Sequence, residues 1–165
     1  MNVGFVQERY TAALRAWLNK AGHYLNNAPP GALFCVTVRA MVSGLLGPEP
    51  GGELLGICVV GRPIARRLPQ DGSVGEVVRM WLAPGLPHGT ASALLRESAD
   101  IARARGMTSL IAYHDRTRHT GCIYRKAGFR RDGVTHPPAN GWATRGGRAS
   151  SGYETTPKRR WRLTL

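Results

Sequence analysis

The stretch TGCIYRKAGF, residues 120–129, decides the fold assignment. It predicts a short helix over 119–128 that ends at Gly128, because glycine readily takes the left-handed conformation that closes a helix. Phe129 then begins a new element. Tyr124 lies one helical turn before Gly128, and the residues alone leave two interpretations open. It is either a core aromatic on an amphipathic helix or a phenol that donates a proton to a leaving group.

The chain before this stretch alternates between strands and helices. A strand is expected over 107–114, after the clearest helix of the sequence, 87–106, which has one apolar face and a glycine at its end. Further upstream, turns at 47–52 and 68–73 separate three apolar stretches, which predicts antiparallel strands. These strands are expected over 32–42, 53–63 and 74–82. The second is almost entirely apolar, so we predict that it is central in the sheet.

The two ends of the chain complete the expected fold. The apolar spacing of 7–22 predicts a first helix. A strand is expected to start at Phe129, directly after the 119–128 helix, and residues 161–165 are expected to form the last strand of the domain. Residues 135–160 are rich in Gly, Pro, Ser and Arg and predict a long loop or a segment that becomes ordered on a partner. We therefore predict one α/β (α+β) domain over 1–135, with a basic C-terminal extension, 136–165, that packs on the domain or extends it.

The composition fits a single globular domain of 165 residues, enough to bury a core. The apolar runs are too short to span a membrane, and the N-terminus lacks the pattern of a signal peptide. Cys35, Cys58 and Cys122 have no CxxC spacing, which favours small buried hydrophobic side chains in a reduced protein. We expect a cytoplasmic protein that does not associate with membranes. The sequence leaves its oligomeric state open, a homodimer included.

The chain is strongly basic, with a net charge of +13 that arginine supplies almost alone. This charge favours a polyanionic partner, such as nucleic acid or a phosphorylated cofactor. A G+C-rich genome and a solvated tail are the alternatives. Arginines pair with phosphates and tryptophans stack on bases, so basic residues interleaved with tryptophan predict binding of double-stranded DNA. The candidates are Arg62, Arg66, Arg67, Trp142, Arg145, Lys158, Arg159 and Arg160.

The turn before the 87–106 helix is a candidate phosphate site. The first turn of a helix leaves backbone N–H groups free and carries the positive end of the helix dipole, so it attracts anions. An ordinary helix start has the same properties, and no GK[ST] follows that would make this a Walker loop. The candidate phosphate-binding residues are Gly89, Thr90, Ala91 and Ser92.

The order of these elements, with the turn and the Y-x-x-x-G-F segment, resembles the GNAT acyltransferase superfamily. The resemblance covers about residues 1–135. It implies a mixed central sheet flanked by helices, in which the amides of the turn hold the pyrophosphate of an acyl-CoA such as acetyl-CoA. In LPHGTA, 86–91, Gly89 and Ala91 match the family pattern Q/R-x-x-G-x-G/A, whereas Leu86 departs from it.

The segment IYRKAGF, 123–129, matches the family's Y-x-K-x-G-F. The tyrosine of that segment is the usual general acid of the family. The resemblance therefore implies that Tyr124 protonates the leaving thiolate.

A narrower resemblance is to the phage Mom family, which converts the N6 amine of adenine in DNA to a carbamoylmethylated form that blocks restriction enzymes. It is carried by HYLNNAPPG, VVGRP, EVVRMWL and SLIAYHD…GCIYRKAGF. The resemblance implies an iron site or base-positioning site at His23, Tyr24 and Asp115, and catalytic roles for Asp115, Ser92 and Tyr124. It also implies location in the host cytoplasm for a phage-encoded protein.

Two further groups are candidates on chemical grounds alone. Glu76 lies in an otherwise apolar strand and is either a general base for an attacking amine or a solvent-facing edge residue. Arg79, three residues later, is expected to point to the opposite face of the sheet. His114 and His119 flank the same region and are alternative ligands or bases.

These patterns lead to three functional hypotheses. The first is a Mom-type enzyme that modifies adenine in DNA. The second is an ordinary acetyl-CoA-dependent N-acetyltransferase that acts on a small amine, a protein or RNA. The third is a DNA-binding protein that has the fold without catalysis. The sequence does not name the acyl donor or the base that would be modified.

Overall fold

A computed structural model describes residues 2–22, 28–136 and 156–165 of the chain. The strands are β1 (Val3–Glu8), β2 (Phe34–Ala40), β3 (Val42–Gly44), β4 (Gly47–Glu49), β5 (Leu54–Gly61), β6 (Val74–Leu82), β7 (Ser109–Asp115), β8 (Arg130–Thr135) and β9 (Lys158–Thr164). The helices are α1 (Ala12–Lys20), α2 (Thr90–Ala104) and α3 (Cys122–Lys126). This is the mixed α/β class that the sequence predicted.

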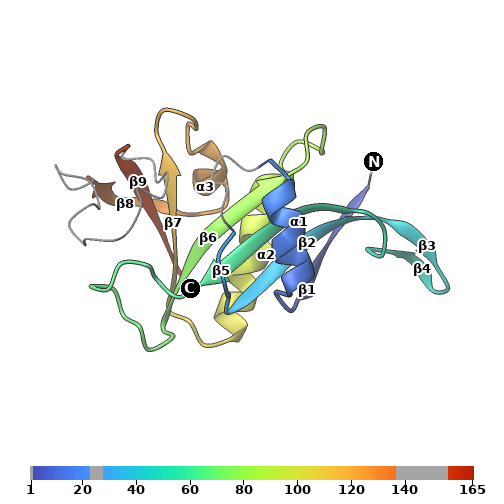
Figure 1. Cartoon of the computed structure of the whole chain (residues 1–165), viewed down its shortest axis with the longest axis horizontal. Helices are drawn as coiled ribbons and strands as arrows, with labels where there is room; N and C mark the ends of the chain where they lie inside the picture. Colours follow the sequence, from blue (N-terminus) through green and yellow to red (C-terminus); the bar gives the residue numbers. More distant parts are fainter. Residues whose placement is uncertain (1, 23–27, 137–155) are drawn as a thin grey trace.

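Seven of these strands form one sheet in the order β1-β2-β5-β6-β7-β9-β8, and β3 pairs with β4 in a small hairpin. The strands β1, β2, β5 and β6 are antiparallel neighbours, β6 and β7 are parallel, and β7, β9 and β8 are antiparallel again. In Figure 1 the helix α1 lies in front of the sheet and α2 lies behind it. The predicted antiparallel set β2, β5 and β6 is confirmed.

The face behind the sheet carries the larger core. The inner side of α2 supplies Leu94, Leu95 and Ala102, all fully buried, and these side chains pack with residues of β2, β5 and β7. The helix ends at Arg105, and Gly106 follows with a φ of 77°, a conformation that glycine adopts without steric cost. The sequence placed this helix end correctly.

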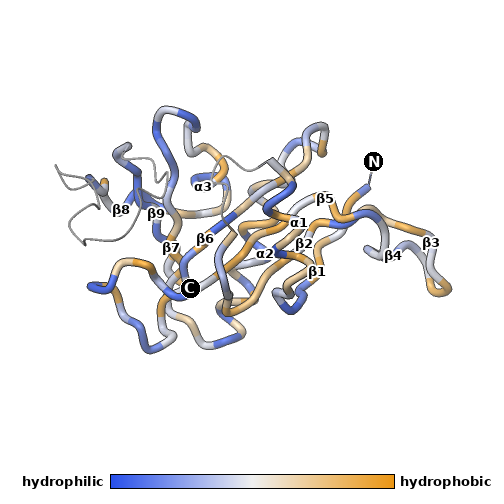
Figure 2. The backbone as a smooth tube through the Cα atoms, in the orientation of Figure 1, coloured by the Kyte–Doolittle hydropathy of each residue, from blue (hydrophilic) through white to orange (hydrophobic). Residues whose placement is uncertain are grey.

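The face in front of the sheet carries a smaller core under α1. The buried residues Leu14 and Leu18 pack on Cys35, Ile57 and Val59 of the sheet. The central strand β5 is buried on both faces, which explains why its sequence is apolar throughout. In Figure 2 the hydrophobic colour follows much of the inner strands and also marks the tip of the β3–β4 hairpin, whereas several other loops are hydrophilic or mixed.

The structure corrects the prediction for the N-terminus. Of the predicted helix over 7–22, residues 12–20 form α1, whereas residues 7 and 8 are the end of a strand, β1, that was not predicted. The Thr11 side chain accepts a hydrogen bond from the Leu14 N–H, so the helix cannot begin before this cap. The predicted turn at 47–52 contains β4, and its hairpin has two fully exposed leucines at the tip, Leu45 and Leu46.

Near the C-terminus, residues 158–164 are part of the sheet. Strand β9 begins at Lys158, earlier than predicted, and pairs with β7 on one side and β8 on the other. Among the cysteines, Cys35 and Cys58 are buried as expected, but Cys122 is exposed at the start of α3, which is a correction. No helix in the described part of the chain has the length and apolar character needed to cross a membrane.

Candidate functional site

The strands β6 and β7 separate above a short ladder. Residues 74–77 of β6 pair with 109–112 of β7, although both strands continue beyond these residues. Strand β6 has a bulge directly after the last residue of this ladder. Val59 of β5 lies opposite Arg79 and Val60 lies opposite Val77, so Val78 is the extra residue. A bulge bends its strand and increases the local twist. Figure 1 shows that β6 and β7 then diverge, with α3 beside β7.

The predicted phosphate turn connects β6 to α2. Gly89 caps the helix with a φ of 94° and without a side-chain hydrogen bond. The Thr90 and Ser92 hydroxyls donate to the carbonyl oxygens of Pro87 at 2.7 Å and Gly89 at 2.9 Å. Both side chains are buried. The two hydroxyl groups therefore stabilise the turn through these hydrogen bonds. The backbone N–H groups at the start of the helix are the donors available to bind an anion.

Tyr124 lies in α3 between two glycines in the left-handed region, Gly121 with a φ of 75° and Gly128 with a φ of 91°. The side chain is 7% exposed. Its ring stacks on His114 and Trp161, with centroid distances of 5.8 Å and 5.6 Å, and meets Phe129 edge-on at 5.9 Å. The ring is thus a core residue, as one of the two interpretations held. A buried ring also fixes the place of its phenol oxygen, so this packing is compatible with the other interpretation.

His114 and Trp161 form the buried wall behind Tyr124. The Trp161 Nε1–H donates a 2.6 Å hydrogen bond to Nδ1 of His114, which is 3% exposed. Burial lowers the pKa of His114, and the positive charge of Arg159 lowers it further. The imidazole is therefore neutral at pH 7. The sequence singled out His114, but it contained no signal for the partner Trp161, which comes from a strand 47 positions later.

Asp115 organises the turn after β7. Its Oδ1 atom accepts hydrogen bonds from the Thr117 N–H at 2.8 Å and from the Thr117 hydroxyl at 2.7 Å, and Oδ2 accepts one from Thr156 at 2.9 Å. Arg118 lies 3.8 Å from Oδ2. The carboxylate is fully buried. These contacts connect the β7–α3 turn to the residues just before β9.

Glu76 is buried in β6 and is the second titratable group of the region. Its Oε2 atom accepts a hydrogen bond from the Ile64 N–H at 2.9 Å, and among the described residues none donates to its other oxygen. Burial raises the pKa of Glu76 to about 7, although the Ile64 N–H and the charges of Arg79 and Lys158 act in the opposite direction. A carboxylate with this pKa and a free oxygen is suited to accept a proton near neutral pH.

The bulge corrects the expected orientation of Arg79. Val77 packs in the core behind the sheet, so the adjacent Glu76 faces the side of α1. Beyond the extra residue Val78, Arg79 lies opposite Val59, which belongs to the core under α1. Both charged groups therefore share one face, because a single inserted residue shifts the alternation of the strand.

The basic residues that the sequence proposed lie in two places. Arg62, Arg66 and Arg67 are exposed on the loop between β5 and β6. On β9, Arg160 forms an ion pair with Asp132 at 2.9 Å, which also binds Arg162. Alternation along β9 puts Lys158 and Arg160 on one face of the sheet and Arg159 on the other.

Arg159 belongs to a basic cluster that sequence reasoning missed. Desolvation lowers the pKa of Arg159, and the positive charges of Arg131 and Arg116 lower it further. Arg131 also lies 6.0 Å from the centroid of the Trp161 ring. We call these three residues the arginine cluster. Arg159 on β9 lies directly opposite His114 on β7. Because His114 stacks on Tyr124, the arginine cluster adds positive charge near Tyr124.

The remaining predicted site residues, His23, Tyr24, Trp142 and Arg145, lie outside the described residues. Within 2–22, 28–136 and 156–165 the structure contains no group of three or more His, Cys, Asp or Glu side chains that could hold a metal ion. The iron site implied by sequence therefore has one described member, Asp115, whose oxygens accept the hydrogen bonds given above. His119 donates its backbone N–H to the Asp115 carbonyl oxygen.

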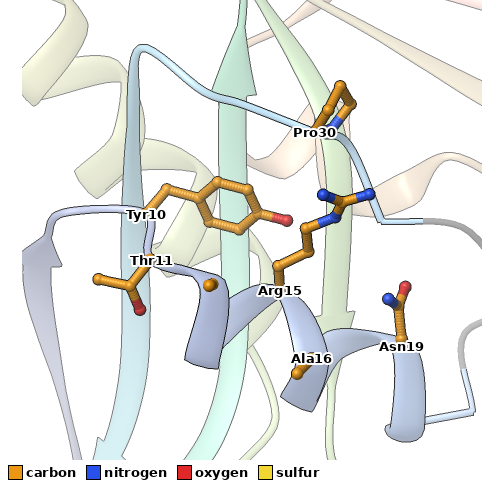
Figure 3. A pocket seen from close by; sticks show the side chains of 7 residues that line it. Tyr10, Thr11, Arg15, Ala16, Asn19 and Pro30 are labelled. Atoms are coloured by element: carbon orange, nitrogen blue, oxygen red, sulfur yellow. The ribbon is translucent and has the colours of Figure 1, made fainter.

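Two surface hollows lie away from this region. One, of about 360 Å³, is lined by Tyr10, Arg15, Asn19 and their neighbours on the outer side of α1, where Figure 3 shows the Tyr10 ring beside the Arg15 side chain. The other, of about 500 Å³, lies between the end of β1 and Arg105. Neither hollow is lined by Tyr124, Glu76 or the turn before α2.

Comparison with known proteins identifies the fold. No family model and no curated protein sequence matches the chain. Among solved structures, an acetyltransferase from Bacillus subtilis in complex with CoA has a TM-score of 0.61 and 18% identity, over 99% of both chains. A GNAT family acetyltransferase from Elizabethkingia anophelis with acetyl-CoA bound has a TM-score of 0.60 and 14% identity, over 99% of both chains.

A third solved structure has a macromolecular acceptor in its name. The ribosomal-protein-S18-alanine N-acetyltransferase from Escherichia coli has a TM-score of 0.61 and 11% identity, over 98% of this chain and 94% of that one. At these identities the likeness shows the fold, which is that of the GNAT acetyltransferases. The narrower resemblance to the Mom family rests on the sequence motifs alone.

Proposed function

We propose that the protein is an acyltransferase that moves an acyl group from acyl-CoA to an amine. The observation that carries this proposal is the divergence of β6 and β7 between the start of α2 and Tyr124. The unpaired ends of these two strands lie between the N-terminus of α2, which follows β6, and the buried phenol of Tyr124, which packs on His114 of β7. The solved structures of the same fold that hold CoA or acetyl-CoA support this choice of donor.

The turn before α2 supplies the donor-binding part of the proposal. Its backbone N–H groups and the helix dipole favour the pyrophosphate of CoA, while Thr90 and Ser92 keep the turn in shape through their own hydrogen bonds. Leu86, which replaces the usual Gln or Arg of the family pattern, contributes no hydrogen bond. Affinity for the donor would then depend on the backbone more than on side chains.

In the proposed reaction Glu76 acts as the base for the attacking amine, and Tyr124 acts as the acid for the leaving thiolate. The amine nitrogen attacks the thioester carbonyl carbon and forms the new C–N bond, and the free oxygen of Glu76 takes the proton that the nitrogen loses. The C–S bond then breaks, and the Tyr124 phenol gives its proton to the departing sulfur. The products are the amide and CoA, and solvent returns Glu76 and Tyr124 to their starting protonation states.

The test is turnover of acetyl-CoA with a panel of primary amines, followed by the release of free thiol. We expect thiol release that depends on the amine and falls strongly in Tyr124→Phe and in Glu76→Gln. Calorimetric titration with CoA provides a measure of donor binding that does not depend on the right acceptor. Absence of CoA binding in the wild-type protein would rule the proposal out.

A second candidate function is modification of a DNA base, with the exocyclic amine of adenine as the acceptor. The net charge of +13, the exposed arginines between β5 and β6 and the arginine cluster favour an acceptor that carries phosphates. An adenine inside a duplex has to leave the stack before its amine can react, and basic side chains can hold the opened strand. The iron implied by the Mom resemblance stays a prediction.

Mass spectrometry of nucleosides separates this candidate from the first. DNA is isolated from cells that express the wild-type protein or Tyr124→Phe and is digested to nucleosides. A heavier adenosine that is present only with the wild-type protein would establish DNA modification, and the added mass would identify the group transferred. If the nucleosides are unchanged while amine-dependent thiol release occurs, the acceptor is another amine.

A further inference from the structure

The hydrogen bond between Trp161 and His114 fixes the position of one proton. An indole N–H can only donate a hydrogen bond, so the Nδ1 atom that it approaches to 2.6 Å must be the acceptor and carries no hydrogen. A neutral imidazole with a bare Nδ1 has its hydrogen on Nε2. The contact thus selects one of the two neutral tautomers of His114.

Packing holds the imidazole in this orientation. Its ring is stacked on Tyr124 with an interplanar angle of 19° and is tilted against Trp161. Gly121 packs closely against the edge of the ring, since a Cβ atom at that position would lie 2.7 Å from Cε1 of His114. A flipped ring would leave the Trp161 N–H buried without its acceptor, which is costly.

The opposite ring nitrogen is left available. No described residue accepts a hydrogen bond from Nε2 of His114, although the side chain is 3% exposed. His114 lies two residues beyond the end of the β6–β7 ladder, in the part of β7 that has separated from β6. Its ring contacts the proposed general acid. A polar N–H group in an almost buried side chain, with no acceptor among the described residues, is available to an acceptor from elsewhere.

We propose that the His114 Nε2–H is a fixed hydrogen-bond donor for a carbonyl oxygen of the acyl-CoA beside Tyr124. This inference rests on the proposed function. The donor is neutral, so it suits the thioester or amide carbonyls of the acyl-pantetheine arm, whereas the phosphates have the helix N-terminus and the arginines for partners. Trp161 acts through His114 and is a positioning residue.

Nitrogen-15 NMR of the full-length protein at a single neutral pH tests the assignment. In the free protein we expect the chemical shifts of the Nε2–H tautomer for His114, with Nδ1 unprotonated. On addition of acetyl-CoA, the Nε2 signal should shift together with the backbone amides of Ala91 and Ser92. In Trp161→Phe the free protein should show a mixture of both tautomers. Trp17→Phe, on the other face of the sheet, is the control and should leave His114 unchanged.

The amide signals separate failure of this inference from failure of the proposed function. If neither Ala91, Ser92 nor His114 responds to acetyl-CoA, the donor does not bind and the proposed function fails. If the two amides shift and the His114 Nε2 signal does not, the function stands and the inference is overturned. An Nδ1–H tautomer in the free wild-type protein would overturn it as well.

A kinetic arm uses the double variant His114→Phe/Trp161→Phe. This variant removes the Trp161 N–H and its acceptor, His114 Nδ1, together, so neither group is left buried without its partner. The phenyl rings keep the stacking on Tyr124. We expect the KM for acetyl-CoA to rise about threefold to tenfold, as the loss of one hydrogen bond predicts, with an unchanged KM for the amine. An unchanged KM for acetyl-CoA in a folded double variant would contradict the proposal.

Discussion

At the scale of single residues, Tyr124 combines two properties that one substitution can separate. Its ring packs on His114, Trp161 and Phe129, and its oxygen carries the proposed chemistry. Tyr124→Phe keeps the ring contacts, so we expect a free energy of unfolding within about 1 kcal/mol of the wild type. Turnover should fall about a hundredfold because the leaving thiolate loses its proton donor. Equal thiol release by both proteins would refute the role of the phenol.

Glu76 sets the expected pH dependence of the reaction. Its pKa of about 7 means that the carboxylate form, which accepts the proton, is lost as the pH falls through 7. We expect kcat/KM of the wild-type protein to decrease below this pH with the slope of a single proton. Glu76→Gln should have low activity that no longer follows this titration. A rate profile without an inflection near pH 7 would show that another group is the base.

The same raised pKa has a consequence for stability. Burial favours the protonated form of Glu76 in the folded state, so its contribution is present below pH 4.5 and is lost as the pH rises through 7. Glu76→Gln stays neutral, and we expect it to be more stable than the wild type at pH 8, by at most about 3 kcal/mol. At pH 4 the two proteins should unfold alike. Denaturant unfolding at both pH values measures the difference.

Gly121 is required by packing as well as by backbone conformation. In Gly121→Ala the new Cβ would lie 2.7 Å from His114 Cε1 and from Trp161 Cζ2. We expect a loss of stability of about 3 kcal/mol or more, from strain and overpacking together. Gly106→Ala is the matched control, since its φ of 77° is nearly the same and the space around it is open. It should lose only about 1 to 2 kcal/mol, the strain part alone.

At the scale of secondary structure, the long periodic elements could be predicted and the short or interrupted ones could not. The apolar run of β5 and the one-sided pattern of α2 carry their own signal. Strand β1 was missed because its residues are all partly exposed at the sheet edge, and the helical spacing that starts at Tyr10 was extended back over Gln7 and Glu8. The bulge at Val78 places the Arg79 side chain on the opposite face of the sheet from the predicted one, because simple strand alternation does not predict an extra residue.

The candidate site shows the same division. Tyr124 and the turn before α2 could be found because each lies beside a glycine with a positive φ, which marks an element end in the sequence. The contact of Trp161 with His114 could not be found, because it depends on β9 pairing directly with β7 and leaving β8 at the edge. Local sequence does not encode which strand lies beside which.

The turn before α2 gives a prediction at this scale. The Ser92 hydroxyl donates to the Gly89 carbonyl oxygen, so Ser92→Ala should cost about 1 kcal/mol of stability and leave the KM for acetyl-CoA almost unchanged. If the hydroxyl binds phosphate instead, the KM should rise and the stability should not change. Thermal unfolding and steady-state kinetics of the same variant distinguish the two roles.

At the scale of the whole molecule, the positive charge predicts salt-sensitive binding to nucleic acid. Replacement of Arg62, Arg66 and Arg67 by Gln removes three exposed charges from one loop. We expect the slope of log Kd against log salt for duplex DNA to decrease by up to about 3. The matched control replaces three exposed arginines on other elements, Arg9, Arg96 and Arg103. Equal slopes for both triple variants would mean that the charge acts without a defined surface.

The place of β9 between β7 and β8 also governs when the site can come into existence. The paired residues of β7 and β8 precede those of β9 by 23 to 55 positions, so this pairing closes long loops and is expected to be among the slower steps of folding. An intermediate that has formed the sheet only as far as β7 would lack Trp161, and the ring of Tyr124 would have lost one of its walls. Catalytic competence should therefore appear together with the last strand, well after most of the secondary structure is in place.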